Sequence, residues 1–192
     1  MKYLLCILAL LTGTACSRAE READPKARIT EYYDVSGLLR RQMRELAKTD
    51  AQLIKDVSYI DQDERDTLHL VGPQIRQELR MFTEMDINRA VLSGRYSIST
   101  SQEGGYEVTR YQADEPEELQ VNYLEVYRQG DEVRRLEALF SDRNLLYNST
   151  RTLTMTLTEE ELPLSYSIVG IQKMIFRDSV AYSIQGQFVY DK

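Results

Sequence analysis

Cys16 is the residue with the clearest chemical potential in this sequence. It ends an N-terminal stretch in which Lys2 supplies a positive charge, residues 3–11 form an apolar run, and small residues follow. This order is typical of a secretory signal with a small-residue cleavage site. The apolar run has nine residues, whereas a transmembrane helix needs about 20. We therefore expect residues 1–15 to be a signal peptide, and Cys16 to begin the mature chain.

The four residues that end at the cysteine, Gly13-Thr14-Ala15-Cys16, resemble a bacterial lipobox, although the best-known lipobox has Leu where Gly13 stands. The resemblance implies that the Cys16 sulfur receives diacylglycerol and that its amine is acylated, for example with palmitate. Several acyl chains, at about 0.8 kcal/mol per buried methylene, anchor a protein stably where one chain does not. The alternative is an ordinary secreted protein cut near Ala15, with Cys16 unmodified.

The residues after the cysteine bear on location. Ser17 stands where an Asp would signal retention, so analogy with sorting in Gram-negative envelopes favours the outer membrane. Surface-exposed lipoproteins often carry a compact acidic cluster at this point, but Arg21 interrupts the acidic residues Glu20, Glu22 and Asp24. A periplasm-facing position is therefore favoured over a surface-exposed one. Residues 16–28 are polar and read as the lipidated cysteine with its tether, and residues 29–192 as one domain.

Charge and cysteine content exclude several classes of function. Lys2 is the only charged residue of the signal, so the mature chain has 23 basic and 31 acidic residues, a net charge of −8. An acidic domain is a poor ligand for nucleic acid. Cys6 leaves with the signal and acylation occupies Cys16, so neither an internal disulfide nor a thiolate metal site is expected. No cofactor is predicted.

Few other residues suggest chemistry. His69 is the only histidine, and a lone histidine in a strand is more often structural than catalytic. The acidic stretches 114–118 and 159–161 lack the spacing of a calcium loop, and phosphate-loop and nucleophile-elbow motifs are missing. Thr67 and Ser179 lie in three-residue patterns that resemble O-glycosylation acceptors of Bacteroidota envelopes. We therefore predict a chain that is not an enzyme.

Hydrophobic periodicity predicts two amphipathic helices. Asp24-Pro25 could cap and begin the first helix, which would have about five turns, with apolar residues at helical spacing from Tyr32 to Leu46. The second would follow Gly72-Pro73 and end near Asp86. Between them, residues 53–70 suggest a hairpin with its turn at 61–64.

From Gly94 onward the period changes to two, which predicts six to eight sequential strands. The clearest is the run at residues 152–158, where apolar residues alternate with threonines. Tyrosine recurs through these strands and could line a carbohydrate or lipid site, but we favour sheet and core packing as its role. The expected fold is α+β, with two amphipathic helices packed on a curved antiparallel β-meander and a small hairpin between the helices.

Four segments of the mature chain resemble a family of uncharacterised envelope lipoproteins of Bacteroidota. They are residues 32–38, 82–89, 144–147 and 167–173. The resemblance implies an envelope location and a single domain of unknown function, and it carries no catalytic residues.

Three functional hypotheses follow. The leading one is a membrane-anchored, non-enzymatic interaction or accessory module with an envelope protein as partner. The alternative is a carrier or binder of an apolar or saccharide ligand in the concavity of the curved sheet. The third is a hydrolase, which would need two carboxylates converging in a cleft.

Overall fold

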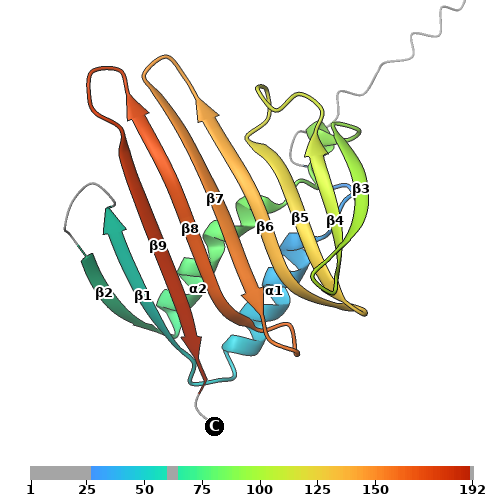
Figure 1. Ribbon diagram of the computed structural model, residues 1–192. Coiled ribbons are helices and arrows are strands. Elements are labelled where there is room, and N and C mark those ends of the chain that lie inside the picture. Colours follow the sequence, from blue (N-terminus) through green and yellow to red (C-terminus); the bar gives the residue numbers. More distant parts are fainter. Residues whose placement is uncertain (1–26, 60–64, 191–192) are drawn as a thin grey trace, which may run out of the picture.

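The protein is built on one antiparallel sheet of nine strands, in the order β2-β1-β9-β8-β7-β6-β5-β4-β3 (Figure 1). The computed structural model describes residues 27–59 and 65–190. Cys16, the predicted signal and the predicted turn at 61–64 therefore lie outside the described residues. The strands are β1 (Gln52–Tyr59), β2 (Arg65–Val71), β3 (Tyr96–Glu103), β4 (Tyr106–Ala113), β5 (Val121–Gln129), β6 (Glu132–Arg143), β7 (Tyr147–Leu157), β8 (Pro163–Met174) and β9 (Val180–Val189).

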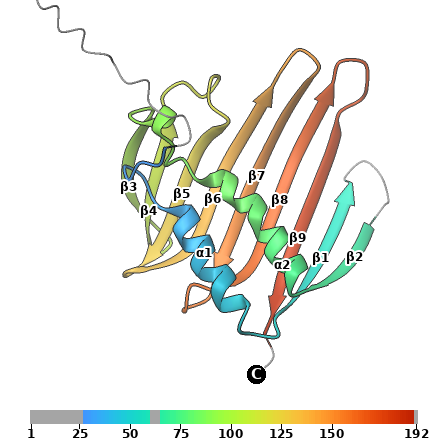
Figure 2. The same cartoon turned by 180° about the vertical axis from the view of Figure 1, so that it is seen from behind.

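The predicted fold class is wrong. Strands make up 54% of the structure and helices only 18%, so the helices are a minor part of a predominantly β chain. Two helices lie across one face of the sheet, α1 (Val35–Leu46) and α2 (Pro73–Leu79), the latter continued by the 3₁₀ helix η1 (Arg80–Met85) (Figure 2). A short 3₁₀ turn, η2 (Ala90–Leu92), precedes β3. Instead of two long helices, there is one of 12 residues and one of seven.

The first helix begins later than predicted because Asp34, not Asp24, is its N-cap. The Asp34 side chain accepts a hydrogen bond of 2.8 Å from the Gly37 backbone N–H, which satisfies one donor of the first turn. A Cβ at position 37 would collide with the Asp34 carboxylate in its capping position, so a larger residue there would displace the cap. The apolar spacing between residues 32 and 46 therefore includes a non-helical entry segment.

The hairpin predicted between the helices exists, but it belongs to the main sheet. β1 pairs with β2 on one side and with β9 on the other, so the N-terminal hairpin extends the C-terminal edge of the meander. Leu53 faces Leu70 across the hairpin and Phe188 across the junction with β9. This long-range pairing joins both ends of the described chain in one sheet.

The core lies between the helices and the face of the sheet that they cover, which we call the covered face. Phe82 from η1, Phe140 from β6 and Met155 from β7 are fully buried there. Leu39 and Leu79 contribute the buried sides of α1 and α2. The alternation predicted for residues 152–158 therefore turns apolar side chains toward the helices and threonines away from them.

Two glycines of the covered face lie opposite tyrosines. Gly186 of β9 pairs with Tyr166 of β8, and Gly170 of β8 pairs with Tyr182 of β9. The ring of each tyrosine lies over the facing glycine, where a Cβ atom would otherwise stand. Tyr166 is 3% exposed, packs edge-on against Phe82 and Phe188, and donates a 2.6 Å hydrogen bond to Glu78.

Candidate functional site

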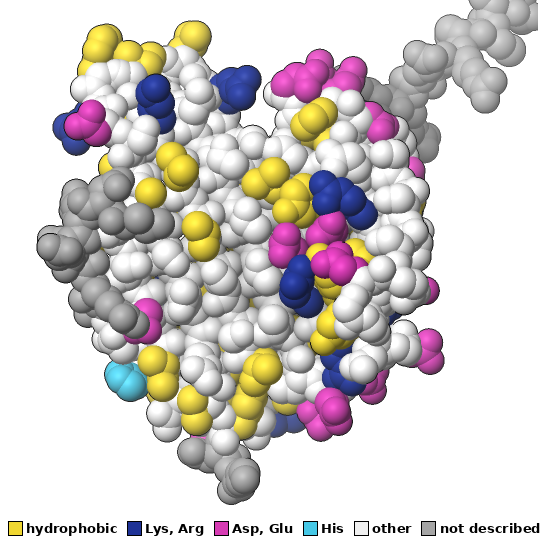
Figure 3. All heavy atoms as spheres, viewed as in Figure 1, with side chains coloured by type: hydrophobic (Ala, Val, Ile, Leu, Met, Phe, Trp, Pro, Cys, Tyr) yellow, Lys and Arg dark blue, Asp and Glu magenta, His cyan; other side chains and the backbone are white. Residues whose placement is uncertain are grey.

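The face of the sheet turned away from the helices, which we call the open face, is not covered by any described element (Figures 1 and 3). Its side chains are those that alternate with the core residues along each strand. Over β7, β8 and β9 they are mainly hydroxyls and amides. These residues are Thr152, Thr154, Thr156, Ser165, Ser167, Ser183, Gln185 and Gln187.

A shallow groove of about 530 Å³ crosses this polar area between β1 and β7. Its lining includes Thr154, Ser167, Gln185 and Asp56. Asp56 accepts a 2.6 Å hydrogen bond from the hydroxyl of Thr67 on β2. The volume is in the range of small-ligand sites, about 300–1,000 Å³. Hydroxyl and amide groups beside the apolar side chains of Ile54 and Leu164 suit a neutral ligand that presents both hydroxyls and apolar surface.

Beside the groove, two glutamates on the open face lie opposite each other in register, Glu125 on β5 and Glu137 on β6. Opposed residues of an antiparallel pair have Cβ atoms about 4.5–5.5 Å apart. The structure thus brings together two carboxylates, as the hydrolase hypothesis requires. Figure 3 shows acidic and basic side chains gathered in this area.

Each glutamate is already paired. Glu125 forms an ion pair with Arg110 and accepts a 2.8 Å hydrogen bond from the Tyr127 hydroxyl. Glu137 lies 3.3 Å from Arg135 and accepts a 2.9 Å hydrogen bond from the Tyr123 hydroxyl. The two carboxylates therefore belong to one closed network, in which each has an arginine and a tyrosine as partners.

The arginines also stack on the tyrosines. The Arg110 guanidinium lies 4.0 Å from the ring centre of Tyr123, and that of Arg135 lies 3.7 Å from the ring centre of Tyr127. Burial, followed by the hydrogen bond to a glutamate, raises the pKa of Tyr123 and of Tyr127 to about 12. Both tyrosines stay neutral at physiological pH and hold the network together as donors.

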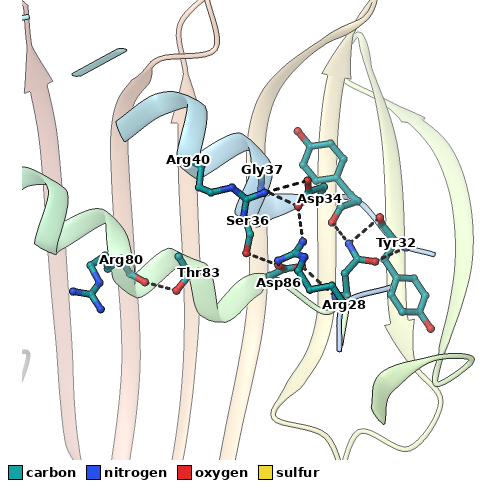
Figure 4. A network of polar contacts seen from close by, with 11 residues as sticks. Arg28, Tyr32, Asp34, Ser36, Gly37, Arg40, Arg80, Thr83 and Asp86 are labelled. Carbon is teal, nitrogen blue, oxygen red and sulfur yellow. Dashed lines mark hydrogen bonds and ion pairs between the residues drawn. The ribbon is translucent and has the colours of Figure 1, made fainter. Parts of the chain in front are cut away.

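A second polar network fixes the start of the described chain to the helical layer (Figure 4). Arg28 binds Asp34 at 2.7 Å and the buried Asp86 at 2.6 Å, and the Ser36 hydroxyl also donates to Asp86. The side chain of Asn88, which is 1% exposed, accepts from the Tyr32 N–H at 2.9 Å and donates to the Tyr32 carbonyl at 3.0 Å. This network holds residues 28–34 against the helical layer.

The residues singled out in the sequence are scattered. His69 is exposed on β2, opposite Ile54, and Thr67 lies two residues away on the same face. Ser179 is in the β8–β9 turn, at the far end of the sheet from the groove residue Gln187. The predictions of lipidation at Cys16 and of O-glycosylation at Thr67 and Ser179 stay predictions.

The two acidic stretches are engaged in local contacts. Arg95 binds Glu115 at 2.6 Å and Glu118 at 2.7 Å. Glu161, which has a left-handed backbone (φ 57°), accepts a 3.0 Å hydrogen bond from the Val133 N–H and pairs with Arg41. Within residues 27–59 and 65–190, no group of three or more His, Cys, Asp or Glu side chains is arranged to hold a metal ion.

The tyrosines divide between the two faces. Tyr32, Tyr96 and Tyr111 pack edge-on in the core, with ring centres 5.5 and 5.8 Å apart, whereas Tyr123 and Tyr127 belong to the open-face network. Sequence reasoning missed this network. The network could have been suspected from the i, i+2, i+4 spacing of Tyr123, Glu125 and Tyr127, which places them on one face of a strand. A tight turn and a second charged strand follow them.

Neither the models of protein families, nor the curated proteins, nor the solved structures with which the chain was compared match it. Among the described residues, no helix has the length and apolar character needed to cross a bilayer. The resemblance to Bacteroidota envelope lipoproteins therefore remains a prediction.

Proposed function

We propose that this chain is a lipid-anchored, non-enzymatic interaction module of a bacterial cell envelope, held at the outer membrane through Cys16 and facing the periplasm. The anchor is supported by the order of residues 1–16. A net charge of −8 in the mature chain argues against attachment through a basic surface, because anionic lipids would repel it.

The observation that carries the non-enzymatic part is the closed network around Glu125 and Glu137. A general base must be free to take a proton, and a glycosidase needs carboxylates about 5–9.5 Å apart across a substrate cleft. Here each carboxylate is neutralised by an arginine and accepts from a tyrosine. The network serves better as a rigid, polar recognition surface than as a catalytic centre.

The partner of the leading hypothesis is an envelope protein that binds the open face. Affinity capture from the native envelope tests this, comparing the full chain with a Gln185→Arg variant that obstructs the groove. The control is Arg44→Glu, on the exposed side of α1. Loss of one defined partner only in the Gln185→Arg variant is expected. Equal capture by all three chains, or turnover of a substrate by the purified chain, contradicts the proposal.

A saccharide ligand is the second candidate, and the hydroxyl- and amide-lined groove favours it. We expected this ligand in the concavity of the sheet, but the space between the sheet and the helices is filled by buried side chains. The candidate is therefore a ligand of the open face instead. Screening the full chain against neutral glycans tests it, with Gln185→Arg expected to abolish binding. Glycan binding that Gln185→Arg leaves unchanged contradicts this location.

A further inference from the structure

The tips of two hairpins expose large apolar side chains. Leu145 and Leu146 lie in the β6–β7 turn and are 89% and 70% exposed, while Ile175 and Phe176 lie in the β8–β9 turn and are 49% and 99% exposed. The Ile175 N–H donates a 3.1 Å hydrogen bond to the Leu146 carbonyl, which joins the two tips. We call these four residues the tip patch. Exposed apolar clusters of this kind mark contacts with a membrane or a protein.

The tip patch lies at the end of the sheet where the described chain begins. Successive turns of an antiparallel meander alternate between its two ends, so the β4–β5, β6–β7 and β8–β9 connections share one end (Figure 1). β3 starts at this same end. The Ala90 N–H, which just precedes β3, donates a 2.8 Å hydrogen bond to the Ala27 carbonyl. The tether therefore enters the domain at the end that carries the tip patch.

The opposite end has a different character. Its turns contain Gly104-Gly105, Gly130-Asp131 and the acidic residues Glu159 and Glu160. Its exposed large apolar side chains lie within strands β2, β8 and β9 and not at hairpin tips, namely Val71, Leu164 and Val189, which are 54%, 45% and 40% exposed. Charges of both signs flank the tip patch, namely Arg143, Lys173 and Arg177 together with Asp142 and Asp178. The acidic β4–β5 loop also lies at the tip-patch end, several strands away, so attraction to anionic lipid is not the driving force. Burial of the apolar side chains of the tip patch drives the contact instead.

Chain length keeps the point where the tether enters the domain close to the bilayer. Eleven peptide units separate Cys16 from Ala27, and they span at most about 40 Å when fully extended. A domain held on so short a tether meets the membrane at a high effective concentration, so a weak apolar contact suffices to orient it.

We propose that the tip patch inserts into the boundary between headgroups and acyl chains of the bilayer that holds the Cys16 lipid. The contact orients the domain with the long axes of its strands along the membrane normal, so that the open face stays accessible to a partner. This inference rests on the lipid anchor of the proposed function.

Because the chain contains no tryptophan, a Phe176→Trp variant carries a single tryptophan, at the tip, whose fluorescence serves as the probe. The acylated full chain is purified from membranes and reconstituted in phosphatidylcholine vesicles with or without brominated acyl chains. We expect the brominated lipid to quench the probe at least twofold. A matched Glu160→Trp variant, with its probe in the exposed turn at the opposite end, should not be quenched. Leu145→Ser with Leu146→Ser, in the Phe176→Trp chain, should at least halve the quenching.

The outcomes separate the two proposals. An acylated, vesicle-bound chain whose tip probe is unquenched overturns this inference and leaves the anchor standing. A tip probe that is shielded only when extracted envelope proteins are added assigns the tip patch to a protein partner and likewise overturns it. A chain whose mass shows no acyl group on Cys16 overturns the anchor, and this inference with it.

Discussion

Substitution of Gly186 by alanine should destabilise the domain far more than the same substitution at Gly170. A Cβ on Gly186 would collide with the ring of Tyr166, and that ring cannot move away. It is held by Phe82 and Phe188, and its hydroxyl by the carboxylate of Glu78, which pairs with Lys55 at 2.7 Å.

The magnitude follows from two terms. Overpacking a core costs about 1–3 kcal/mol, and loss of the hydrogen bond between Tyr166 and the Glu78 carboxylate costs about 1.5–3 kcal/mol. We expect Gly186→Ala to lower the free energy of unfolding by about 3 kcal/mol. A Cβ on Gly170 would meet the far end of the half-buried Tyr182 ring at 2.6 Å, and that ring can swing outward. The cost there is offset by the lower entropy of alanine in the unfolded chain, about 0.5–1 kcal/mol.

Urea unfolding of the two variants measures both effects. With a slope of about 2 kcal/mol per molar urea, the midpoint of Gly186→Ala should fall by about 1.5 M, while that of Gly170→Ala should move by less than about 0.5 M. Equal midpoints for the two variants would refute the reasoning that the hydrogen bond to Glu78 and the aromatic neighbours lock the Tyr166 ring.

Two further predictions concern buried polar groups. Burial raises the pKa of Tyr96 and of Tyr190 to about 12 from the usual 10.0. Since the folded state favours the neutral phenols, the free energy of unfolding should hold up to about pH 10 and fall as the pH rises toward 12. Urea midpoints that stay constant through this range would contradict this prediction. Asn88→Ala removes the hydrogen bonds between Asn88 and the Tyr32 backbone and should lower the free energy of unfolding by about 2–3 kcal/mol in the same assay. A loss below about 0.5 kcal/mol would show that these hydrogen bonds contribute little to stability.

Local sequence patterns predicted the strands well and the helices poorly. The alternation around residues 152–158 and the hairpin between the helices reappear in the structure because side-chain period and turn residues are local properties. The first helix was given about ten residues too many at its start, because Asp24-Pro25 and Asp34 are both acceptable starts. Only the contact between Asp34 and Gly37 distinguishes them.

The arrangement of the sheet and the open-face network could not be read from periodicity. The pairing of β1 with β9 joins segments more than 100 residues apart, and no local signal specifies it. Likewise, Glu125 and Glu137 meet only because β5 and β6 pair in a particular register. The exposed tip patch was missed for a different reason, since apolar residues in a turn look like ordinary strand ends until their exposure is known.

Acylation of Cys16 is the central claim, and mass spectrometry of the mature chain measures it most directly. The full chain is produced in a Gram-negative host with a palmitate analogue and compared with Cys16→Ala. The account predicts a wild-type chain that begins at Cys16, carries the label and fractionates with the outer membrane, and a Cys16→Ala chain without label. An unlabelled wild-type chain that begins after Ala15 with a free Cys16 thiol would contradict it.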